Sequence, residues 1–384
     1  MRFERILVPA VVLALASCAP DPSAAGATAS AAASTRTSGH ERAGGDRIIT
    51  VMTQNLYLGL DIDPLIGAII GGATQEQIEL LVGQGWALVQ KNDFTRRAEE
   101  IADLVEQVRP ELLGLQEMGL WRVETPGDAV LGAPPDATEV AYDHLETLLG
   151  ALAARHLDYV PASVIQNFDG EFPGRTATGE RFDLRYTDRD AILARGDVKI
   201  VSAQGGNFAA MIGPDVGVPI AIPRGWTSVE LKLQGERLRV FEAHLETSSP
   251  IQELQALELV TRVEAGVTPV ALLGDFNSDA NGTGTDTYAA LLAPAFLDAW
   301  SVAHPGEPGL TCCHLADLTL SGLPLTTRID LVLTGRGITP MDAEILPSLE
   351  SADFAVGDLW PSDHAGVGAT LRLEKPRFVH LAAE

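Results

Sequence analysis

Short apolar runs that end in a polar side chain recur along the chain. Residues 48–55 alternate branched and polar side chains, which is typical of a β-strand, and the run ends at Asn55. Apolar residues at helical spacing predict a helix over residues 95–108, and the apolar run 112–117 that follows it ends at Glu117. These segments indicate a local α/β unit in which each strand ends in a potential ligand.

Further strands and helices follow the same two patterns. Strands are predicted over residues 191–194, 227–233, 237–244, 269–273, 329–333 and 367–373. Helices are predicted over residues 143–154 and 252–265. A single parallel sheet would need more crossover helices than this, so the pattern favours two packed sheets with helices outside. The sequence shows no internal repeat and no second domain boundary.

Asp275 and Asn277 follow the apolar run 270–273 directly after Gly274. Two interpretations compete: a strand followed by an Asx turn, or a strand that ends in a polar site with both side chains on one face. Groups suited to metal and phosphate chemistry stand at other strand ends, and this recurrence favours the polar site. These groups are Asn55, Glu117, His244, Asp330, Asp363 and His364.

Among the compositional properties of the chain, its net charge bears most on the choice of substrate. The chain has 384 residues, of which 46% are hydrophobic, so it can bury a substantial core. Its 27 basic and 52 acidic residues give a net charge of −25. A negative field opposes binding along a polyanion, so long nucleic acid is a disfavoured substrate, although a local basic patch can still bind it.

The N-terminus has the features of an export signal. Arg2 and Arg5 precede an apolar stretch over residues 6–16, which is too short to span a bilayer as a permanent helix. Leu15-Ala-Ser-Cys18 resembles a bacterial lipoprotein box, in which the cysteine becomes the acylated first residue of the mature chain. The alternative is an ordinary signal peptide with a chance cysteine.

These features predict the organisation of the first segment and its location. Residues 1–18 are a lipoprotein-type signal peptide, and residues 19–46, rich in Ala, Ser, Thr and Gly, are a flexible tether. The protein is then exported and anchored to the membrane or cell surface through Cys18. Without acylation it would be secreted or periplasmic.

Only Cys312 and Cys313 remain after processing. Adjacent cysteines can close only a strained ring, so no stabilising disulfide framework is expected. His314 follows directly and suggests a metal site, but zinc ligands normally come as spaced pairs, so buried thiols or a local redox pair are the preferred interpretations, and the redox state of the two cysteines stays open.

Six short motifs occur in a fixed order along the chain. They are Gln54-Asn55, Leu115-Gln-Glu117, Ala243-His-Leu245, Gly274-Asp-Phe-Asn277, Arg328-Ile-Asp330 and Ser362-Asp-His364. Their order and spacing resemble the endonuclease/exonuclease/phosphatase superfamily, the DNase I-like metal-dependent phosphoesterases. The resemblance implies a four-layered α/β/β/α sandwich of two packed mixed sheets flanked by helices. The domain would cover residues 47–374, with an insertion at about 59–92 and a tail over residues 375–384.

The resemblance also implies a metal site. Glu117 resembles the principal Mg²⁺ ligand of the family, with Asn55 beside it and Asp363 close enough to help hold the ion. Mn²⁺ and Ca²⁺ are alternatives. In-line attack on a phosphoester brings a nucleophile to an anion, and a hard cation held by oxygen ligands neutralises that charge.

The remaining motif residues are implied to act on the phosphate. Asp275 and Asn277 would position the attacking water and the phosphate, and His364 would lie against the phosphate, paired with Asp330. His244 would lie near the phosphoryl oxygens. A histidine beside phosphate and aspartate is favoured in its charged form, which suits charge stabilisation or proton donation. Whether Asp275 or a histidine is the general base stays open.

Three further features bear on the substrate. The insertion over residues 59–92 contains many apolar residues and is either a packed helical cap or an apolar lid. Glu242 either pairs with His244 or is solvated. Arg175, Arg181, Arg185, Arg189 and Arg195 could clamp phosphates or form ion pairs with the acidic residues between them, and Arg189 is the preferred phosphate contact.

Three functions are consistent with the sequence. The preferred one is an exported, divalent-metal-dependent hydrolase of a phosphodiester or phosphomonoester, acting on a small or lipid-linked substrate as a monomer. The second is an extracellular endonuclease or exonuclease. The third is a non-catalytic binding protein on the same fold. The physiological substrate is not identified by the sequence.

Overall fold

The computed structural model describes residues 47–130, 134–214, 220–265, 268–319, 324–347 and 359–374. The predicted signal peptide, the acylated Cys18, the tether and the C-terminal tail lie outside these ranges. Within them, no helix combines the length and the apolar character needed to cross a membrane.

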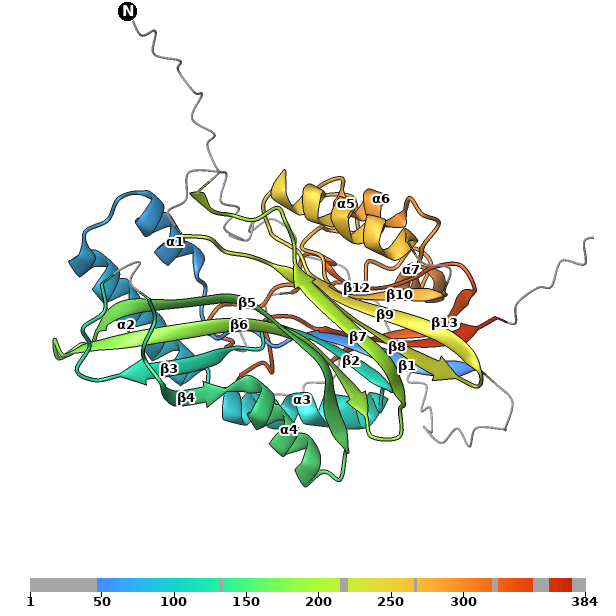
Figure 1. Ribbon diagram of the computed structural model, residues 1–384, viewed down its shortest axis with the longest axis horizontal. Helices are drawn as coiled ribbons and strands as arrows, with labels where there is room; N and C mark the ends of the chain where they lie inside the picture. The colour runs from blue at the N-terminus through green and yellow to red at the C-terminus, as the bar shows by residue number, and fades with distance from the viewer. Residues whose placement is uncertain are drawn as a thin grey trace, which may run out of the picture. The chain divides into compact units, whose positions relative to one another are not determined.

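Two mixed β-sheets form the centre of the fold (Figure 1). The strands of the first sheet are β1 (Ile48–Asn55), β2 (Leu112–Gln116), β3 (Leu120–Glu124), β4 (Glu139–Asp143), β5 (Tyr159–Arg175), β6 (Arg181–Arg195), β13 (Ile338–Leu346) and β14 (Gly366–Leu373). They run in the order β13-β14-β1-β2-β6-β3-β4, and β5 pairs with β6.

The second sheet is built entirely from strands of the chain's second half. Its strands are β7 (Ile200–Asn207), β8 (Gly225–Leu233), β9 (Glu236–His244), β10 (Val270–Asp275), β11 (Leu297–Asp298) and β12 (Asp330–Thr334). They run in the order β11-β12-β10-β9-β8-β7. The pairs β1–β2 and β9–β10 are parallel, which makes both sheets mixed.

Helices cover the outer faces of both sheets (Figure 1). α3 (Phe94–Val108) and α4 (His144–Ala154) pack on the first sheet, whereas α5 (Ile251–Glu264) and α6 (Thr287–Leu292) pack on the second. The short helix α7 (Ala299–Ala303) follows β11. The resulting order of helices, sheet, sheet and helices confirms the predicted four-layered α/β/β/α sandwich.

Strand β1 shows how the sequence pattern produces these layers. Ile49 and Val51 face the second sheet and belong to the core between the sheets, whereas Met52 packs against the helices. All three side chains are fully buried. Because β1 is buried on both faces, its apolar residues include the neighbours Val51 and Met52, so its alternation of apolar and polar residues is not strict.

Several strands escaped the sequence analysis because they lie near sheet edges. β7 is an edge strand of the second sheet, and most of its residues are exposed. β5 pairs along most of β6 but contains Pro161 and Pro173, which edge strands tolerate. Only the C-terminal end of β6, residues 191–194, has the continuous apolar run that identified it. Burial on both faces is thus what made a strand predictable.

The insertion is helical, as the helical-cap hypothesis expected. It forms α1 (Asp63–Ile70) and α2 (Gln75–Lys91), and α2 begins with a capping box between Thr74 and Gln77. α2 approaches β5 so closely that a Cβ added at Gly83 would clash with the Arg175 carbonyl oxygen. The two helices and the strands beneath them therefore share a separate apolar cluster.

Candidate active site

The predicted catalytic residues meet because neighbouring strands end at the same place. In the parallel pair β9–β10, His244 is in register with Asp275. In the antiparallel pair β10–β12, Asp275 is opposite Asp330. Asn55 ends β1 next to the end of β2, which leads directly to Glu117. Side chains from distant parts of the sequence are thereby brought to one region.

Asp275 is the centre of this cluster. Its Oδ2 accepts a hydrogen bond of 3.1 Å from Asn55 Nδ2 and lies 3.6 Å from His244 Nε2 and 3.8 Å from His364 Nδ1. Burial, together with the neighbouring Asp330 carboxylate, raises the pKa of Asp275 to about 7. This carboxyl group can therefore gain or lose a proton near neutral pH.

Asn277 reaches the site through a turn. The strand ends at Asp275, and the backbone N–H of Asn277 donates to Asp275 Oδ1 at 2.9 Å, which is an Asx turn. Asn277 adopts a left-handed conformation with φ 51°, which asparagine tolerates well. The Asx turn is therefore confirmed, and the turn, rather than strand alternation, brings Asn277 close to His244.

His364 and Asp330 form a tight pair. The distance between His364 Nδ1 and Asp330 Oδ2 is 2.8 Å, and both residues are buried. Burial alone would lower the pKa of His364, but the carboxylates of Asp330, Asp363 and Asp275 outweigh it and raise the pKa well above its ordinary value. His364 is thus held as a charged imidazolium.

His244 is held in the opposite state. Burial, and then the charges of Arg224 and His364, lower its pKa well below the ordinary value. Its Nδ1 lies 3.1 Å from Arg224 Nη1, and its Nε2 lies 3.2 Å from Asn277 Nδ2. Because both ring nitrogens face hydrogen-bond donors, an imidazolium would place N–H groups against N–H groups. The two histidines therefore differ in charge although their rings belong to one cluster.

Arg224 is a site residue that the sequence analysis missed. Its guanidinium lies 3.7 Å from Asp188 and 3.8 Å from Glu246, and its buried Nε has no hydrogen-bond partner. A fixed guanidinium beside His244 is suited to binding a phosphoryl oxygen. The only sequence signal was a single basic residue between Pro223 and Gly225, which is weak in any chain.

The predicted metal ligands offer oxygen donors only. Glu117 follows β2 in a left-handed conformation with φ 54°, and its Oε2 accepts from Leu58 N–H at 2.9 Å. Burial raises the pKa of Asp363 to about 7, with Glu117 adding to the effect and His364 opposing it. Carboxylate oxygens and a neutral amide oxygen are the kind of ligands that a hard divalent cation prefers.

A second group of potential ligands overlaps the catalytic cluster. Ligand atoms of Asp275, Asp330 and His364 all lie within 4.8 Å of one another. The buried Oδ1 of Asp330 has no hydrogen-bond partner. The site is therefore rich in oxygen donors beyond Glu117, Asn55 and Asp363, and a divalent cation would neutralise their mutual repulsion.

Arg189 lies elsewhere than predicted. Its guanidinium donates to the carbonyl oxygens of Met118 at 3.0 Å and Gly119 at 3.4 Å, and to Asp143 Oδ1 at 2.6 Å. These acceptors belong to the segment that follows Glu117 and to the helix cap of α4. The structure thus corrects the prediction: Arg189 supports the Glu117 loop, since protein acceptors already occupy its donors.

The other four arginines also form ion pairs. Arg175 and Arg181 pair with Glu79, Arg185 pairs with Asp169, and Arg195 pairs with Glu111 and Asp197. The phosphate clamp is therefore not formed, and the ion-pair alternative holds. The partners are not the interspersed acidic residues. Asp183 accepts hydrogen bonds from the backbone N–H groups of Asp128 and Ala129, and Asp188 pairs with Arg224.

Both alternatives predicted for Glu242 are wrong. It is fully buried, and its Oε1 accepts from Gln116 Nε2 at 3.0 Å, so it neither pairs with His244 nor is solvated. Burial, followed by the charge of Asp190, raises its pKa well above the ordinary value. Glu242 is thus a protonated group between the two sheets.

The two adjacent cysteines lie at the edge of the site. A disulfide joins Cys312 and Cys313, which corresponds to the local redox pair that was one of the two predicted alternatives. Cys312 is buried as expected, and its Sγ lies 3.6 Å from His364 Nε2. His314 stacks on Trp360 with ring centroids 4.1 Å apart, which gives that histidine a packing role.

The loops that carry the site are tied together by Arg97. This buried side chain donates to the carbonyl oxygens of Leu56 at 2.6 Å and Pro361 at 2.9 Å. Ser362 Oγ donates in turn to the Asn55 carbonyl oxygen at 2.7 Å. Arg97 was missed as well, although an arginine on the apolar face of a predicted helix is an anomaly that can be read from sequence.

Comparisons with known proteins agree with this geometry. The model of the Endonuclease/Exonuclease/phosphatase family matches residues 52–364. The fold is similar to an endonuclease/exonuclease/phosphatase family protein from Bacteroides thetaiotaomicron, at 18% identity and a TM-score of 0.53, covering 85% of this chain and 98% of that one. A family protein from Beutenbergia cavernae matches at 19% identity and a TM-score of 0.52, covering 85% and 72%.

A third solved structure carries a specific name. The mannosyl-6-phosphatase of Bacteroides thetaiotaomicron is 17% identical with a TM-score of 0.50, covering 84% of this chain and 99% of that one. At these identities the likeness shows the fold alone. The curated proteins contain no significant match. The family match, which spans most of the chain, shows that this protein belongs to the endonuclease/exonuclease/phosphatase family, whose members are generally phosphoester hydrolases.

Proposed function

We propose that this protein is a Mg²⁺-dependent phosphoesterase that hydrolyses a small or lipid-linked phosphoester by in-line attack of water. The observation that carries the proposal is the cluster around Asp275, which brings a neutral and a charged histidine within 4 Å of one carboxylate. A purely structural cluster has no need for two histidines in opposite protonation states.

Each side chain has a role that follows from its charge. Asp275, whose pKa is about 7, aligns the attacking water and accepts its proton. The charged His364, held by Asp330, stabilises the negative charge that develops on phosphate or protonates the leaving group. Arg224, which lies against the neutral His244, binds the phosphoryl oxygens.

Glu117, Asp363 and Asn55 would hold the divalent cation. When bound, a Mg²⁺ ion supplies charge neutralisation and polarisation of the phosphoryl group. A few firm oxygen ligands suit Mg²⁺, because this ion retains several of its waters. The remaining catalytic work, which is to orient water and phosphate and to move the proton, falls to the side chains around Asp275.

A hydrolysis assay tests the proposed function. Purified protein with Mg²⁺ should cleave para-nitrophenyl phosphate or bis(para-nitrophenyl) phosphate, and it should nick supercoiled DNA poorly even at low salt. The net charge of −25 and the ion-paired arginines are the reasons for expecting poor nicking. Efficient nicking would favour the nuclease, and inactivity on all phosphoesters would favour a non-catalytic protein.

Stability should depend on pH and Mg²⁺ together. Asp275 and Asp363 have pKa values raised from 3.8 to about 7, so the folded state binds more protons than the unfolded state between these values. The metal-free protein should therefore lose stability as the pH rises through this range. Because Mg²⁺ would favour the ionised carboxylates, it should raise Tm more at about pH 8 than at about pH 5.

Thermal melting with Mg²⁺ and with an equal ionic strength of NaCl measures this effect. The salt control separates specific binding from general screening of the acidic surface. A Tm increase that is the same at both pH values, or that NaCl reproduces, would contradict a Mg²⁺ site at these carboxylates.

A further inference from the structure

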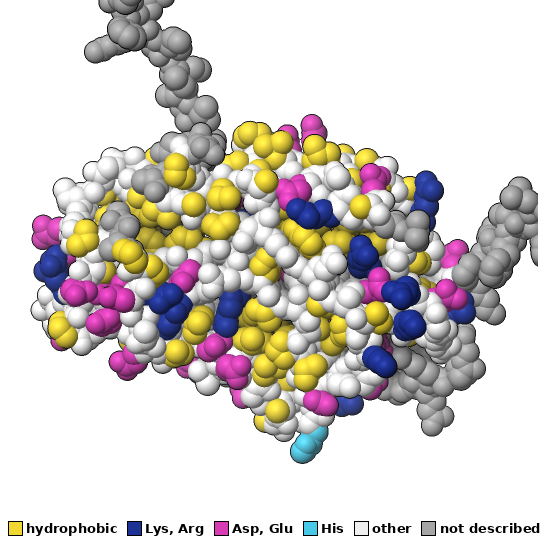
Figure 2. Space-filling model, in the orientation of Figure 1, with side chains coloured by type: hydrophobic (Ala, Val, Ile, Leu, Met, Phe, Trp, Pro, Cys, Tyr) yellow, Lys and Arg dark blue, Asp and Glu magenta, His cyan; other side chains and the backbone are white. Residues whose placement is uncertain are grey.

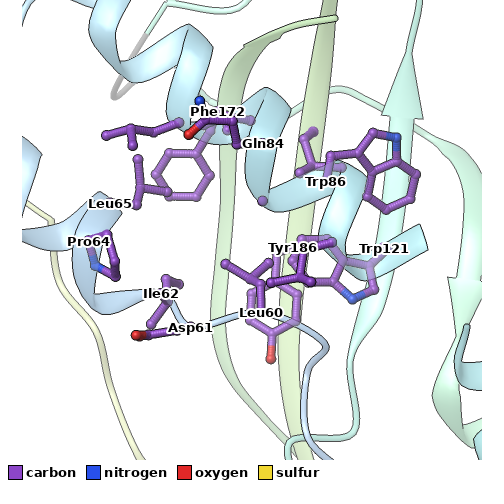
Figure 3. A pocket seen from close by; sticks show the side chains of 15 residues that line it. Leu60, Asp61, Ile62, Pro64, Leu65, Gln84, Trp86, Trp121, Phe172 and Tyr186 are labelled. Carbon is purple, nitrogen blue, oxygen red and sulfur yellow. The ribbon is translucent and has the colours of Figure 1, made fainter. Parts of the chain in front are cut away.

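A largely apolar cavity of about 250 Å³ opens between the insertion and the long hairpin (Figure 3). The α1 side contributes Leu60 and Leu65, α2 contributes Trp86, and the strands contribute Trp121, Phe172 and Tyr186. Figure 2 shows hydrophobic side chains gathered on this face of the molecule near α1. Figure 3 shows Leu65 and Pro64 on one side of the opening and the two tryptophans on the other.

One wall of the cavity is connected to the metal-binding side of the active site. The backbone N–H of Leu58 donates to Glu117 Oε2 at 2.9 Å, and the Leu58 carbonyl oxygen accepts from Trp121 Nε1 at 3.2 Å. Leu60, two residues further along, lines the cavity. The segment that touches Glu117 therefore continues directly into the cavity wall.

A second wall is connected to the phosphate-binding side. The hydroxyl of Tyr186 donates to Asp188 Oδ1 at 2.9 Å, and Asp188 pairs with Arg224 at 3.7 Å. Arg224 in turn lies 3.1 Å from His244 Nδ1. The charge of Arg224 also acts on Asp63, at the start of α1. The cavity thus lies beside groups from both halves of the active site.

The size and charge of the cavity restrict its occupant. An engineered apolar cavity of about 150 Å³ binds benzene, so about 250 Å³ suits a fused aromatic ring or a short alkyl chain. A long acyl chain does not fit inside. Asp61 lines the cavity and is exposed, and its carboxylate opposes a second phosphate or any other anion at the opening. The occupant is therefore small, apolar and uncharged.

We propose that this cavity is a subsite for one uncharged apolar substituent, an aromatic ring system or a short alkyl group, of the phosphoester that the active site hydrolyses. This inference rests on the proposed phosphoesterase function. Burial of the substituent would hold the phosphorus atom between Glu117 and Arg224. Apolar contacts then add specificity to a site whose other interactions with substrate are with phosphate oxygens alone.

Alkyl para-nitrophenyl phosphates with Mg²⁺ test the subsite by activity. The hexyl ester should have a kcat/KM at least about tenfold above that of the methyl ester, because its methylene groups leave water. A hexadecyl ester should gain nothing beyond the hexyl ester, since the cavity is too small. Equal kcat/KM values for the methyl and hexyl esters would overturn the inference while leaving the phosphoesterase function intact.

Gly85 provides a variant that fills the cavity. Gly85 lies on α2 and lines the cavity. A Cβ added at this position would lie 3.4 Å from Leu60 Cδ1, which is an ordinary contact. Gly85→Leu should abolish the preference for the hexyl ester and leave methyl-ester hydrolysis unchanged. Gly150→Leu is the matched control, because Gly150 is an exposed helical glycine of α4 with no atom near its added Cβ. Leu65→Phe serves the same purpose as Gly85→Leu should that variant fail to fold.

Binding of alkylphosphonates gives a readout that needs no hydrolysis. Trp86 and Trp121 line the cavity, so hexylphosphonate should cause a saturable change in tryptophan fluorescence at a concentration about tenfold below that for methylphosphonate. Gly85→Leu should remove this difference. If hexylphosphonate binds more tightly than methylphosphonate but no phosphoester is cleaved, the proposed function is wrong and the subsite is retained. If both phosphonates bind alike, the subsite is wrong whatever the activity.

Discussion

Replacing His364 with alanine is expected to lower kcat/KM on para-nitrophenyl phosphoesters by about a thousandfold, within the range for loss of a general acid or of a charged group that stabilises the transition state. His364 is the imidazolium of the site, and Asp330 holds it through a contact of 2.8 Å. Alanine removes the positive charge closest to the Asp275 carboxylate. Steady-state kinetics at saturating Mg²⁺ measures the loss.

Two further variants test whether the loss of activity is specific to the charged His364. Asp330→Asn keeps the shape of the pair but removes the carboxylate that raises the pKa of His364, so its activity should fall steeply and its pH profile should shift to lower pH. His156→Ala changes an exposed histidine at the end of α4 and should retain full activity. Retention of more than about a tenth of the activity by His364→Ala would remove this residue from the mechanism.

Replacing Glu117 with glutamine should weaken Mg²⁺ binding by about a hundredfold or more, because under the proposed function it removes a negative charge that would coordinate the ion directly. Loss of a group that only hydrogen-bonds to a metal ligand would have a smaller effect. Glutamine has nearly the same shape, and its side-chain oxygen can still accept the hydrogen bond from Leu58 N–H. The fold should therefore be retained while the Mg²⁺ dependence of both activity and Tm is lost at ordinary Mg²⁺ concentrations.

Titration of Mg²⁺ by calorimetry separates this effect from a loss of catalysis. Glu264→Gln is the matched control. Glu264 is an exposed carboxylate at the end of α5, so replacing it removes the same charge, but from the surface. An unchanged Mg²⁺ affinity in Glu117→Gln would show that the ion is held elsewhere, and the overlapping group of Asp275, Asp330 and His364 would be the next candidate.

Much of the fold could be predicted because its central strands are buried on both faces. Strands β10 and β12 contain continuous apolar runs, whereas β1, β9 and β14 mix apolar residues with polar ones, and each of the five was predicted within a few residues. Edge strands such as β7 and β13 were missed, since solvent on one side permits polar residues and proline. Local periodicity therefore found the centre of each sheet and not its borders.

The catalytic set could be predicted for a related reason. Asn55, Asp275 and His244 stand at the ends of predicted strands, and a polar residue in that position is noticeable against the apolar run before it. Arg224 precedes its strand without such a contrast and was missed. Arg189 had an equally plausible position in the sequence, but in the fold its donors are taken by the Glu117 loop.

The sequence by itself determined the family, the layered fold and the list of polar residues at the strand ends, because each depends on local pattern and on order along the chain. Only the tertiary structure decided that the pKa of His364 is raised and that of His244 lowered, that Arg224 lies beside His244 while Arg189 bonds to the segment after Glu117, and that the insertion leaves an apolar cavity. These properties depend on burial and on charges contributed by segments far apart in sequence, and such distances are set only when the sheets pack.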